Sequence, residues 1–184
     1  MLKIRDLIEV PTLFELSTHP EVYPYLRQKA NTVDEFYFLT KQTIEAEEKG
    51  RLISRTILDE FEQPIGTINL FDIQDHSGFL ATWIGQPYFG QGYNQMAKKR
   101  FFNELFFQYD IENIFVKVRK TNTRSLRAIQ KLEYIAIANE LFPDVYDQIN
   151  KKDDIYHLFV ITKEHYASYL QFAQKETNEK EIVS

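Results

Sequence analysis

The chain has 184 residues, near the usual size of one domain, and 43% of them are hydrophobic, enough to bury a sizeable core. It contains no cysteine, which excludes disulfides, thiolate zinc sites and an acyl-cysteine intermediate. The net charge of −5 argues against a nucleic-acid partner, and no apolar run reaches the length of a membrane span, so no membrane partner is expected. Charges interspersed in MLKIRDLIEV do not fit a secretory signal, and we therefore expect a cytoplasmic location.

The first fifty residues predict one strand and two helices. A short strand is expected at LKIR, and a helical pattern follows around Leu13 until Pro20 and Pro24 interrupt it. Thr32 is a good N-cap, and apolar residues recur after it at helical spacing as far as Gly50. The second helix is therefore predicted between Thr32 and Gly50.

Residues 51–85 show a different period. RLISRTILDE alternates in the manner of a strand, and IGTINLFDI and FLATWIG are further β-branched or aromatic runs separated by polar turns. Short turns of this kind join antiparallel neighbours. We predict a three-stranded antiparallel meander.

A loop with two glycines follows this meander. Gly90 and Gly92 flank Gln91 where the strand must turn into a helix predicted from about Asn94 to Tyr109. The first N–H groups of a helix have no partner within it, and the helix dipole favours an anion there. We expect phosphate or pyrophosphate to bind this loop, and a plain tight turn is the alternative.

The rest of the chain predicts a strand at 113–120, a short helix starting near Asn122 or Thr123, and two strands within 133–141 and 154–162. Residues 142–153 read as a connecting loop. We expect one domain over residues 1–176, with a mixed α/β fold, and a frayed tail over residues 177–184.

Other phosphate and metal motifs do not fit the sequence. GxxxxGK[ST] is missing, and GxGxxG fails because Gln95 stands at the third glycine position. The preceding antiparallel strands also disfavour a Rossmann unit. The four histidines are far apart and lack a ligand spacing, so no metal site is expected.

The segment TWIGQPYFGQGYNQMAKKRFFNELF, residues 82–106, resembles motif A of the GNAT superfamily of acyl-CoA-dependent N-acetyltransferases. It is most similar to the ribosomal-protein N-terminal acetyltransferase branch. KVRKTNTRSLRAIQKLEYI, residues 117–135, resembles motif B of that branch. The chain departs from the family at three positions: Pro87 stands where the superfamily has Gln or Arg, Met96 where many relatives have Glu, and Glu133 where a glycine is usual.

This resemblance implies the GNAT fold, with a mixed, mostly antiparallel sheet of six to seven strands flanked by helices. It also implies acetyl-CoA as co-substrate and no metal. The positions that match the family's cofactor site are Trp83, Ile84, Gly85, Phe89, Gly90, Gln91, Gly92, Tyr93, Asn94, Asn122 and Ser125.

The resemblance further implies direct attack of an amine on the thioester. Ile129 stands where many relatives carry the tyrosine acid, so Ser125 is the expected acid near the thiol. Asp144 is the candidate base, with Glu140 or a water chain as alternatives. The expected acceptor is a small-molecule amine or a protein N-terminus, and a homodimer is possible. A non-catalytic acyl-CoA sensor and a nucleotide-binding regulator are the alternative functions.

Overall fold

The computed structural model describes residues 1–182, and the side chains of these residues except those of Arg124 and 176–182. Within the chain there are two compact units, residues 1–110 and the residues from 111 onward. The first unit contains β1 (Leu2–Ile4), η1 (Leu7–Glu9), α1 (Val10–Ser17), η2 (Tyr23–Tyr25), α2 (Val33–Glu48), β2 (Ile53–Leu58), β3 (Pro64–Gln74), β4 (Ser77–Ile84), η3 (Gln86–Tyr88) and α3 (Tyr93–Phe107).

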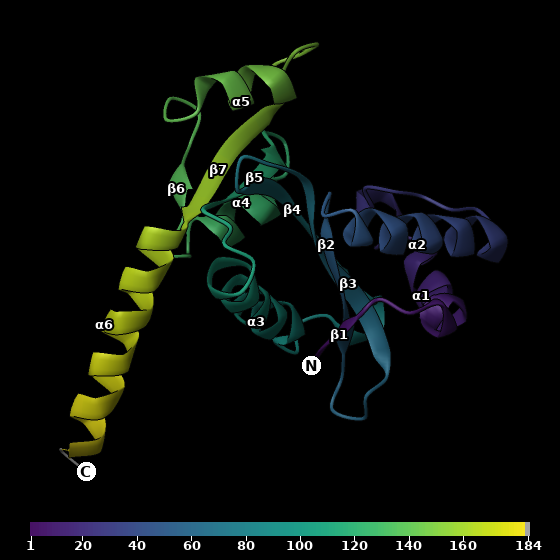
Figure 1. Cartoon of the computed structure of the whole chain (residues 1–184), viewed down its shortest axis with the longest axis horizontal. Helices are drawn as coiled ribbons and strands as arrows, with labels where there is room; N and C mark the ends of the chain where they lie inside the picture. The colour runs from purple at the N-terminus through teal and green to yellow at the C-terminus, as the bar shows by residue number, and fades with distance from the viewer. Residues whose placement is uncertain (183–184) are drawn as a thin grey trace. The chain divides into compact units, whose positions relative to one another are not determined.

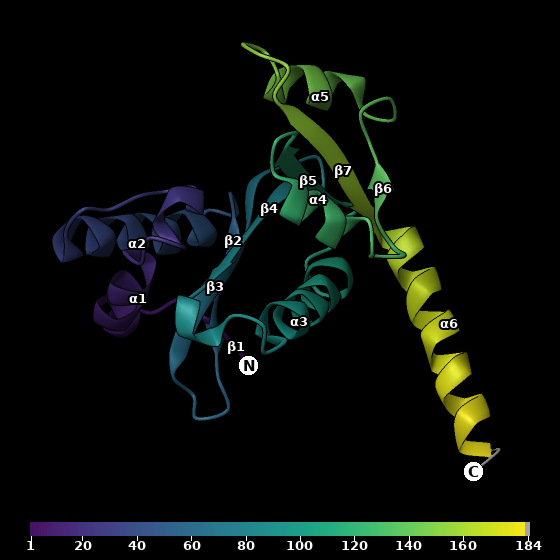
Figure 2. The same ribbon diagram turned by 180° about the vertical axis from the view of Figure 1, so that it is seen from behind.

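The four strands of the first unit pair antiparallel in the order β1-β2-β3-β4 (Figure 1). Helices α1 and α2 cover one face and α3 covers the other, as both views show (Figures 1 and 2). Side-chain alternation explains the two faces. Thr56 donates its hydroxyl to Glu9 at 2.5 Å on the α1 side, and Thr82 donates to Asn94 of α3 at 3.4 Å on the other side.

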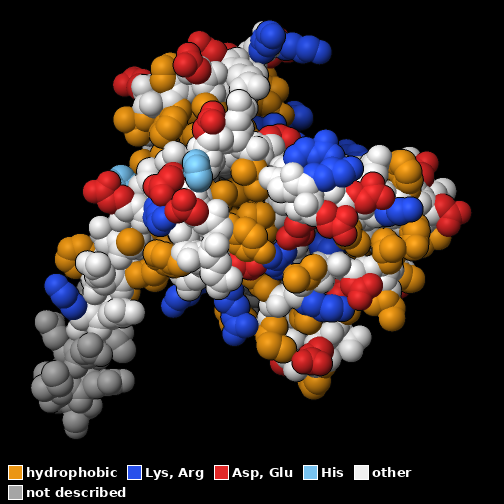
Figure 3. Space-filling model, in the orientation of Figure 1, with side chains coloured by type: hydrophobic (Ala, Val, Ile, Leu, Met, Phe, Trp, Pro, Cys, Tyr) orange, Lys and Arg blue, Asp and Glu red, His pale blue; other side chains and the backbone are white. Residues whose placement is uncertain are grey.

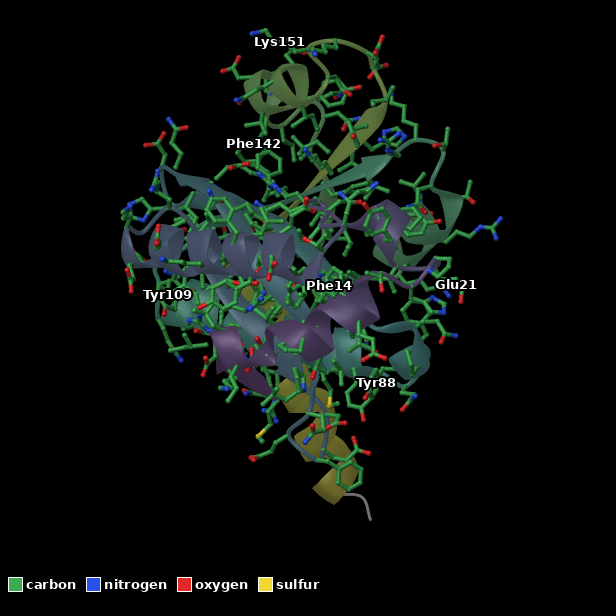
Figure 4. The ribbon with its side chains drawn as sticks, turned by 90° about the vertical axis from the view of Figure 1, so that its right-hand side faces the viewer. Phe14, Glu21, Tyr88, Tyr109, Phe142 and Lys151 are labelled. Atoms are coloured by element: carbon green, nitrogen blue, oxygen red, sulfur yellow. The ribbon has the colours of Figure 1, made fainter. Side chains whose placement is uncertain are left out.

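The boundaries of α2 confirm the local prediction. Thr32 is the N-cap, and its hydroxyl accepts the Glu35 amide at 3.2 Å. The helix ends just before Gly50, which has a left-handed φ of 68°. Phe14, labelled on α1 in Figure 4, packs edge-on against Phe36 of α2, with ring centroids 6.0 Å apart.

Charged groups lie inside the first unit as well as on its surface. The Arg55 side chain is 4% exposed and pairs with Glu47 of α2 at 2.6 Å and with Glu104 of α3. The strand β2 thus ties together the helices on its two faces. On the surface of α1 and α2, acidic, basic and hydrophobic side chains are interspersed (Figure 3).

The second unit contains β5 (Asn113–Arg119), α4 (Thr123–Ile129), β6 (Ala136–Ile137), α5 (Pro143–Ile149), β7 (Tyr156–Thr162) and α6 (Lys163–Ile182). Its strands pair antiparallel in the order β5-β7-β6. The seven strands of the described residues therefore confirm the predicted class, a mixed α/β fold with mostly antiparallel strands.

Two helices of the second unit were not predicted. Residues 143–149, taken from sequence as part of a loop, form α5, which begins with Pro143 at its first position. The segment after β7 forms α6, which continues to Ile182, so residues 177–182 of the expected frayed tail are helical. Val183 and Ser184 lie outside the described residues. Phe142, at the start of α5, is labelled in Figure 4.

None of the helices in residues 1–182 combines the length and the apolar character that crossing a membrane requires. The same residues contain no cluster of three or more His, Cys, Asp or Glu side chains suited to hold a metal ion.

Candidate functional site

The end of strand β4 carries the first predicted site residues. Trp83 pairs with Thr67 of β3, and Ile84 pairs with Gly66. The Gly85 amide donates to the Ile65 carbonyl at 2.7 Å. Because successive backbone groups of a strand point to opposite sides, the Ile84 N–H is directed away from β3. Trp83 is partly exposed and Ile84 is buried.

The segment that follows turns sharply into α3. One turn of 3-10 helix, η3, leads to Phe89, and Gly90 and Gly92 then adopt left-handed φ values of 75° and 85°. A Cβ built on either glycine meets no atom within 4 Å, so the space beside both is open. The side chain of Gln91 folds back and donates to the Pro87 carbonyl at 2.8 Å, which holds the loop in this shape.

The backbone amides of this loop form a row of unpaired donors. Gly92 is the N-cap of α3 and has no side-chain oxygen to cap the helix. The first backbone bond that closes onto the helix runs from the Met96 amide to the Gly92 carbonyl. Within the part of the chain that the structure describes, the amides of residues 90–95 donate to no acceptor. Consecutive donors of this kind make a concave anion site.

Phe89 differs from this row. Its amide donates to the Gln86 carbonyl at 3.1 Å, so Phe89 does not belong to the row of open donors. The row of donors begins one residue later, at Gly90. The 3-10 turn before Phe89 is the reason, because it uses this amide to close itself.

Two hydrogen bonds hold the first turn of α3, one to the turn between β2 and β3 and one to β4. The Tyr93 hydroxyl donates to the carboxylate of Glu60, in the turn between β2 and β3, and this hydrogen bond raises the pKa of the Tyr93 phenol to about 12. Asn94 accepts from Thr82 of β4. Sequence reasoning missed Glu60, because a partner 33 residues away leaves no local pattern. These bonds fix the direction in which the open amides point.

Asn122 and Ser125 lie together in the second unit. Asn122 is the N-cap of α4, and its Oδ1 accepts the Ser125 amide at 3.1 Å. The backbone of Ser125 is therefore satisfied by Asn122, and the Ser125 hydroxyl does not serve as the cap of this helix. Ser125 is partly buried.

Asp144 is placed apart from Ser125. Helix α4 packs through Leu126 and Ile129 onto the face of β5 that carries Val118. Phe142, just before α5, packs instead on Phe115, with ring centroids 5.0 Å apart. Residues 115 and 118 of one strand point to opposite faces. The structure therefore does not bring the exposed Asp144 onto the face of Ser125.

Ile129, at the position of the family's usual acid, fills the core of the second unit. It is 7% exposed and packs with Val118 and Phe159. At this position the chain therefore has a buried apolar side chain that packs α4 onto the sheet, and no group that can donate a proton.

The sequence was compared with protein families. Residues 2–135, more than half of the chain, match the model of the acetyltransferase (GNAT) domain. Among curated proteins no significant match is found.

Solved structures share the fold at low sequence identity. Spermidine N-acetyltransferase from Vibrio cholerae, in complex with CoA and spermine, is 14% identical with a TM-score of 0.72, covering 91% of this chain and 97% of that one. FdhC, a nucleotide-linked sugar GNAT in its apo form, is 16% identical with a TM-score of 0.73 and coverages of 94% and 92%. Mycobacterium smegmatis RimJ with CoA-disulfide is 12% identical with a TM-score of 0.67 and coverages of 89% and 81%.

Proposed function

Since this chain belongs to the GNAT family of acetyltransferases, we propose that it transfers the acetyl group of acetyl-CoA to a primary amine by direct attack. The acceptor is a small molecule or a protein N-terminus. The absence of cysteine agrees with a route that has no acyl-cysteine stage.

One observation carries the proposal: the six consecutive amides of residues 90–95 have no acceptor within the described chain. A pyrophosphate needs several N–H donors on one concave surface, and it is attracted by the dipole of α3. The open space beside Gly90 and Gly92 lets such a group approach the backbone. The residues present therefore fit the diphosphate of coenzyme A.

The end of β4 fits the reacting end of the co-substrate. We assign Trp83, Ile84 and Gly85 to its pantetheine arm, whose amides can pair with a strand backbone. The Ile84 N–H, directed away from β3, is the donor for the negative charge that develops on the thioester oxygen. A donor fixed by a strand ladder needs no reorganisation during the reaction.

Proton transfers are assigned to the second unit. Asn122 holds the start of α4, and the Ser125 hydroxyl, not consumed by capping, protonates the departing thiolate. Asp144 stays the candidate base, acting apart from Ser125, with Glu140 or a water chain in its place if the amine arrives neutral. An α-amine with pKa about 8 is partly neutral near pH 7.5, whereas a lysine amine near 10.4 needs a base.

The acceptor is expected beside α1, α2 and the turn at Asp72. That carboxylate is already paired with Arg27 at 2.7 Å, and the Arg27 guanidinium lies 4.2 Å from the centre of the Phe71 ring. One solved relative is a spermidine N-acetyltransferase with spermine bound, and another is described as a nucleotide-linked sugar GNAT. A panel containing spermine, a peptide with an unblocked N-terminus, an aminoglycoside and an amino acid therefore covers the candidates.

The first test replaces the glycine at the start of α3. Gly92→Trp puts an indole into the diphosphate position, and losing two charge-assisted hydrogen bonds of ~1.5 kcal/mol each weakens acetyl-CoA binding about 100-fold. Gly50→Trp is the matched control, because Gly50 also has a left-handed φ and open space beside it. Isothermal titration with acetyl-CoA measures both variants against the native chain.

Equal affinity of Gly92→Trp and Gly50→Trp for acetyl-CoA would refute the placement of the diphosphate. Release of thiol from acetyl-CoA is then followed with each amine of the panel. Tight binding without thiol release for any amine identifies a sensor instead of an enzyme. Binding of ATP as strong as that of acetyl-CoA identifies a nucleotide-binding regulator.

A further inference from the structure

We infer that Gly66 of β3 is a positioning residue for acetyl transfer, because its missing side chain sets the place of the Ile84 amide on the neighbouring strand. This inference rests on the proposed function and adds a residue that the sequence motifs do not include. Gly66 pairs directly with Ile84 in the β3–β4 ladder.

The two strands approach each other at Gly66 more closely than a side chain allows. A Cβ added to Gly66 would stand 2.2 Å from the Trp83 carbonyl oxygen and 2.8 Å from the Ile84 Cα. Both of these atoms belong to the backbone, so no rotation of a side chain can relieve the overlap. Any residue other than glycine therefore requires the backbones of β3 and β4 to move apart at this point, which changes the position of the end of β4 relative to β3.

The backbone that would move carries the proposed donor. Gly85 is bonded to Ile65 on one side of Gly66, and the Trp83 carbonyl faces β3 on the other. Between them the Ile84 N–H points away from β3, the direction in which the proposed function puts the thioester oxygen. Relief of the overlap displaces the Trp83–Ile84 peptide, and the Ile84 N–H belongs to that peptide.

A displacement of this size matters more for the reaction than for binding. Misplacing a catalytic group by about 1 Å costs on the order of 100-fold in rate. The diphosphate loop at residues 90–95 starts six residues later and is anchored separately, by Glu60 and by Thr82. Gly66→Ala should thus lower kcat by a larger factor than it weakens the binding of acetyl-CoA, whose diphosphate loop stays in place.

Gly78 supplies a matched control in the same pair of strands. A Cβ there would stand 2.8 Å from the Leu70 Cγ, a side-chain atom, and 2.9 Å from the Phe71 carbonyl oxygen, so Gly78→Ala introduces a smaller overlap between the same two strands. Gly78 lies near the start of β4, whereas Ile84 is the last residue of that strand. Comparison of the two variants therefore separates an effect on stability, expected for both, from displacement of the Ile84 N–H, expected for Gly66→Ala alone.

The experiment compares Gly66→Ala, Gly78→Ala and the native chain. We expect both variants to melt at a lower temperature and Gly78→Ala to keep its acetyl-CoA affinity and its kcat within threefold of the native chain. Gly66→Ala alone should lose about 100-fold in kcat, a larger factor than its loss of acetyl-CoA affinity, with little change in KM for the amine. A kcat for Gly66→Ala within threefold of that of Gly78→Ala overturns the inference.

Two NMR measurements do not depend on turnover. In ¹⁵N-labelled protein, the Ile84 amide resonance should shift in Gly66→Ala and not in Gly78→Ala. An unshifted Ile84 resonance in Gly66→Ala overturns the inference, whether or not the protein acetylates any amine. A lack of thiol release with every amine counts against the proposed function alone. If Gly66→Ala does not fold, the native chain is titrated with acetonyl-CoA, whose ketone replaces the thioester, and with CoA. An Ile84 amide that responds equally to both ligands overturns the inference.

Discussion

Lys98 is a lysine of α3 with its side chain partly buried, one helical turn beyond Asn94. Loss of hydration on burial lowers the pKa of its ammonium group. Within the described residues it makes no hydrogen bond or ion pair that would offset this loss. The charged form of Lys98 therefore costs the folded state free energy at neutral pH.

Replacing Lys98 by methionine should stabilise the ligand-free protein at pH 7. A group whose pKa is lower in the folded state than in the unfolded state destabilises folding below the folded-state pKa, and the penalty fades as pH rises toward 10.5. We expect Lys98→Met to melt above the native chain, by ~2–4 °C for each 1 kcal/mol relieved, and the difference to shrink at pH 10.5.

The exposed neighbour Lys99 is the control for this variant. Lys99→Met removes the same charge from the same helix without relieving burial, so its melting temperature should stay near that of the native chain. A rise of equal size for both variants would show that the net charge of α3, not the burial of Lys98, is the cause.

Single-residue rules predicted the helix caps and missed the longer connections. Thr32 and Asn122 cap their helices as their types and positions indicate, because a cap depends on three or four neighbouring residues. The bond between Tyr93 and Glu60 and the close approach at Gly66 depend on strand pairing across the fold. No local pattern in the sequence records either contact.

Among the elements, β2 is buried along its whole length although it carries Ser54, Arg55 and Thr56. The guanidinium of Arg55 is held by Glu47 of α2, Glu104 of α3 and the Tyr109 hydroxyl. Such a strand does not read as a core strand from its hydrophobicity. Its burial follows from the carboxylates that reach it from both helices.

Arg55→Met should destabilise the protein by about 3–5 kcal/mol, because it leaves the carboxylates of Glu47 and Glu104 without their cation. Urea denaturation measures this loss. Arg27→Met is the control, since Arg27 pairs with Asp72 on the surface and is worth about 1 kcal/mol or less. Equal losses for the two variants would mean that the buried pairs contribute no more than the exposed one.

Sequence reasoning missed α5 and α6 for two different physical reasons. Helix α5 has seven residues, too few for a periodic apolar pattern to emerge, and it contacts β7 and carries Phe142 onto Phe115. Helix α6 begins directly after β7, without a glycine or proline to mark the change. Helices α2 and α3 were predicted because their apolar residues recur at helical spacing over several turns.

For the molecule as a whole, acetyl-CoA should act as a stabilising ligand. Binding to the folded chain alone raises the free energy of unfolding by ~2.7 kcal/mol at a ligand concentration of 100 times Kd. Thermal melting with acetyl-CoA, with ATP and without ligand measures the effect. An ATP shift as large as that of acetyl-CoA would contradict the proposed cofactor. Gly92→Trp, which should bind about 100-fold more weakly, should retain only ~0.4 kcal/mol of this stabilisation at the same ligand concentration.

Solved structures at 12–16% identity share the fold over 89–94% of the chain. At such identity the layers of strands and helices persist, while the side chains around an acceptor do not. Sequence patterns accordingly pointed to the family through residues 82–106 and 117–135, which include the loop whose backbone geometry requires glycine. The identity of the acceptor amine does not follow from these patterns, because the acceptor site is lined by side chains that vary between family members.

Trp83 is the single tryptophan of the chain, and it stands next to Ile84 at the end of β4. Light absorbed selectively by its indole is therefore emitted from one known position beside the proposed reaction centre. Its partial exposure makes the emission colour and intensity sensitive to whatever replaces water there. The protein thus contains a built-in optical reporter with which arrival of the thioester and departure of the thiol can be timed in rapid mixing, without attaching a dye.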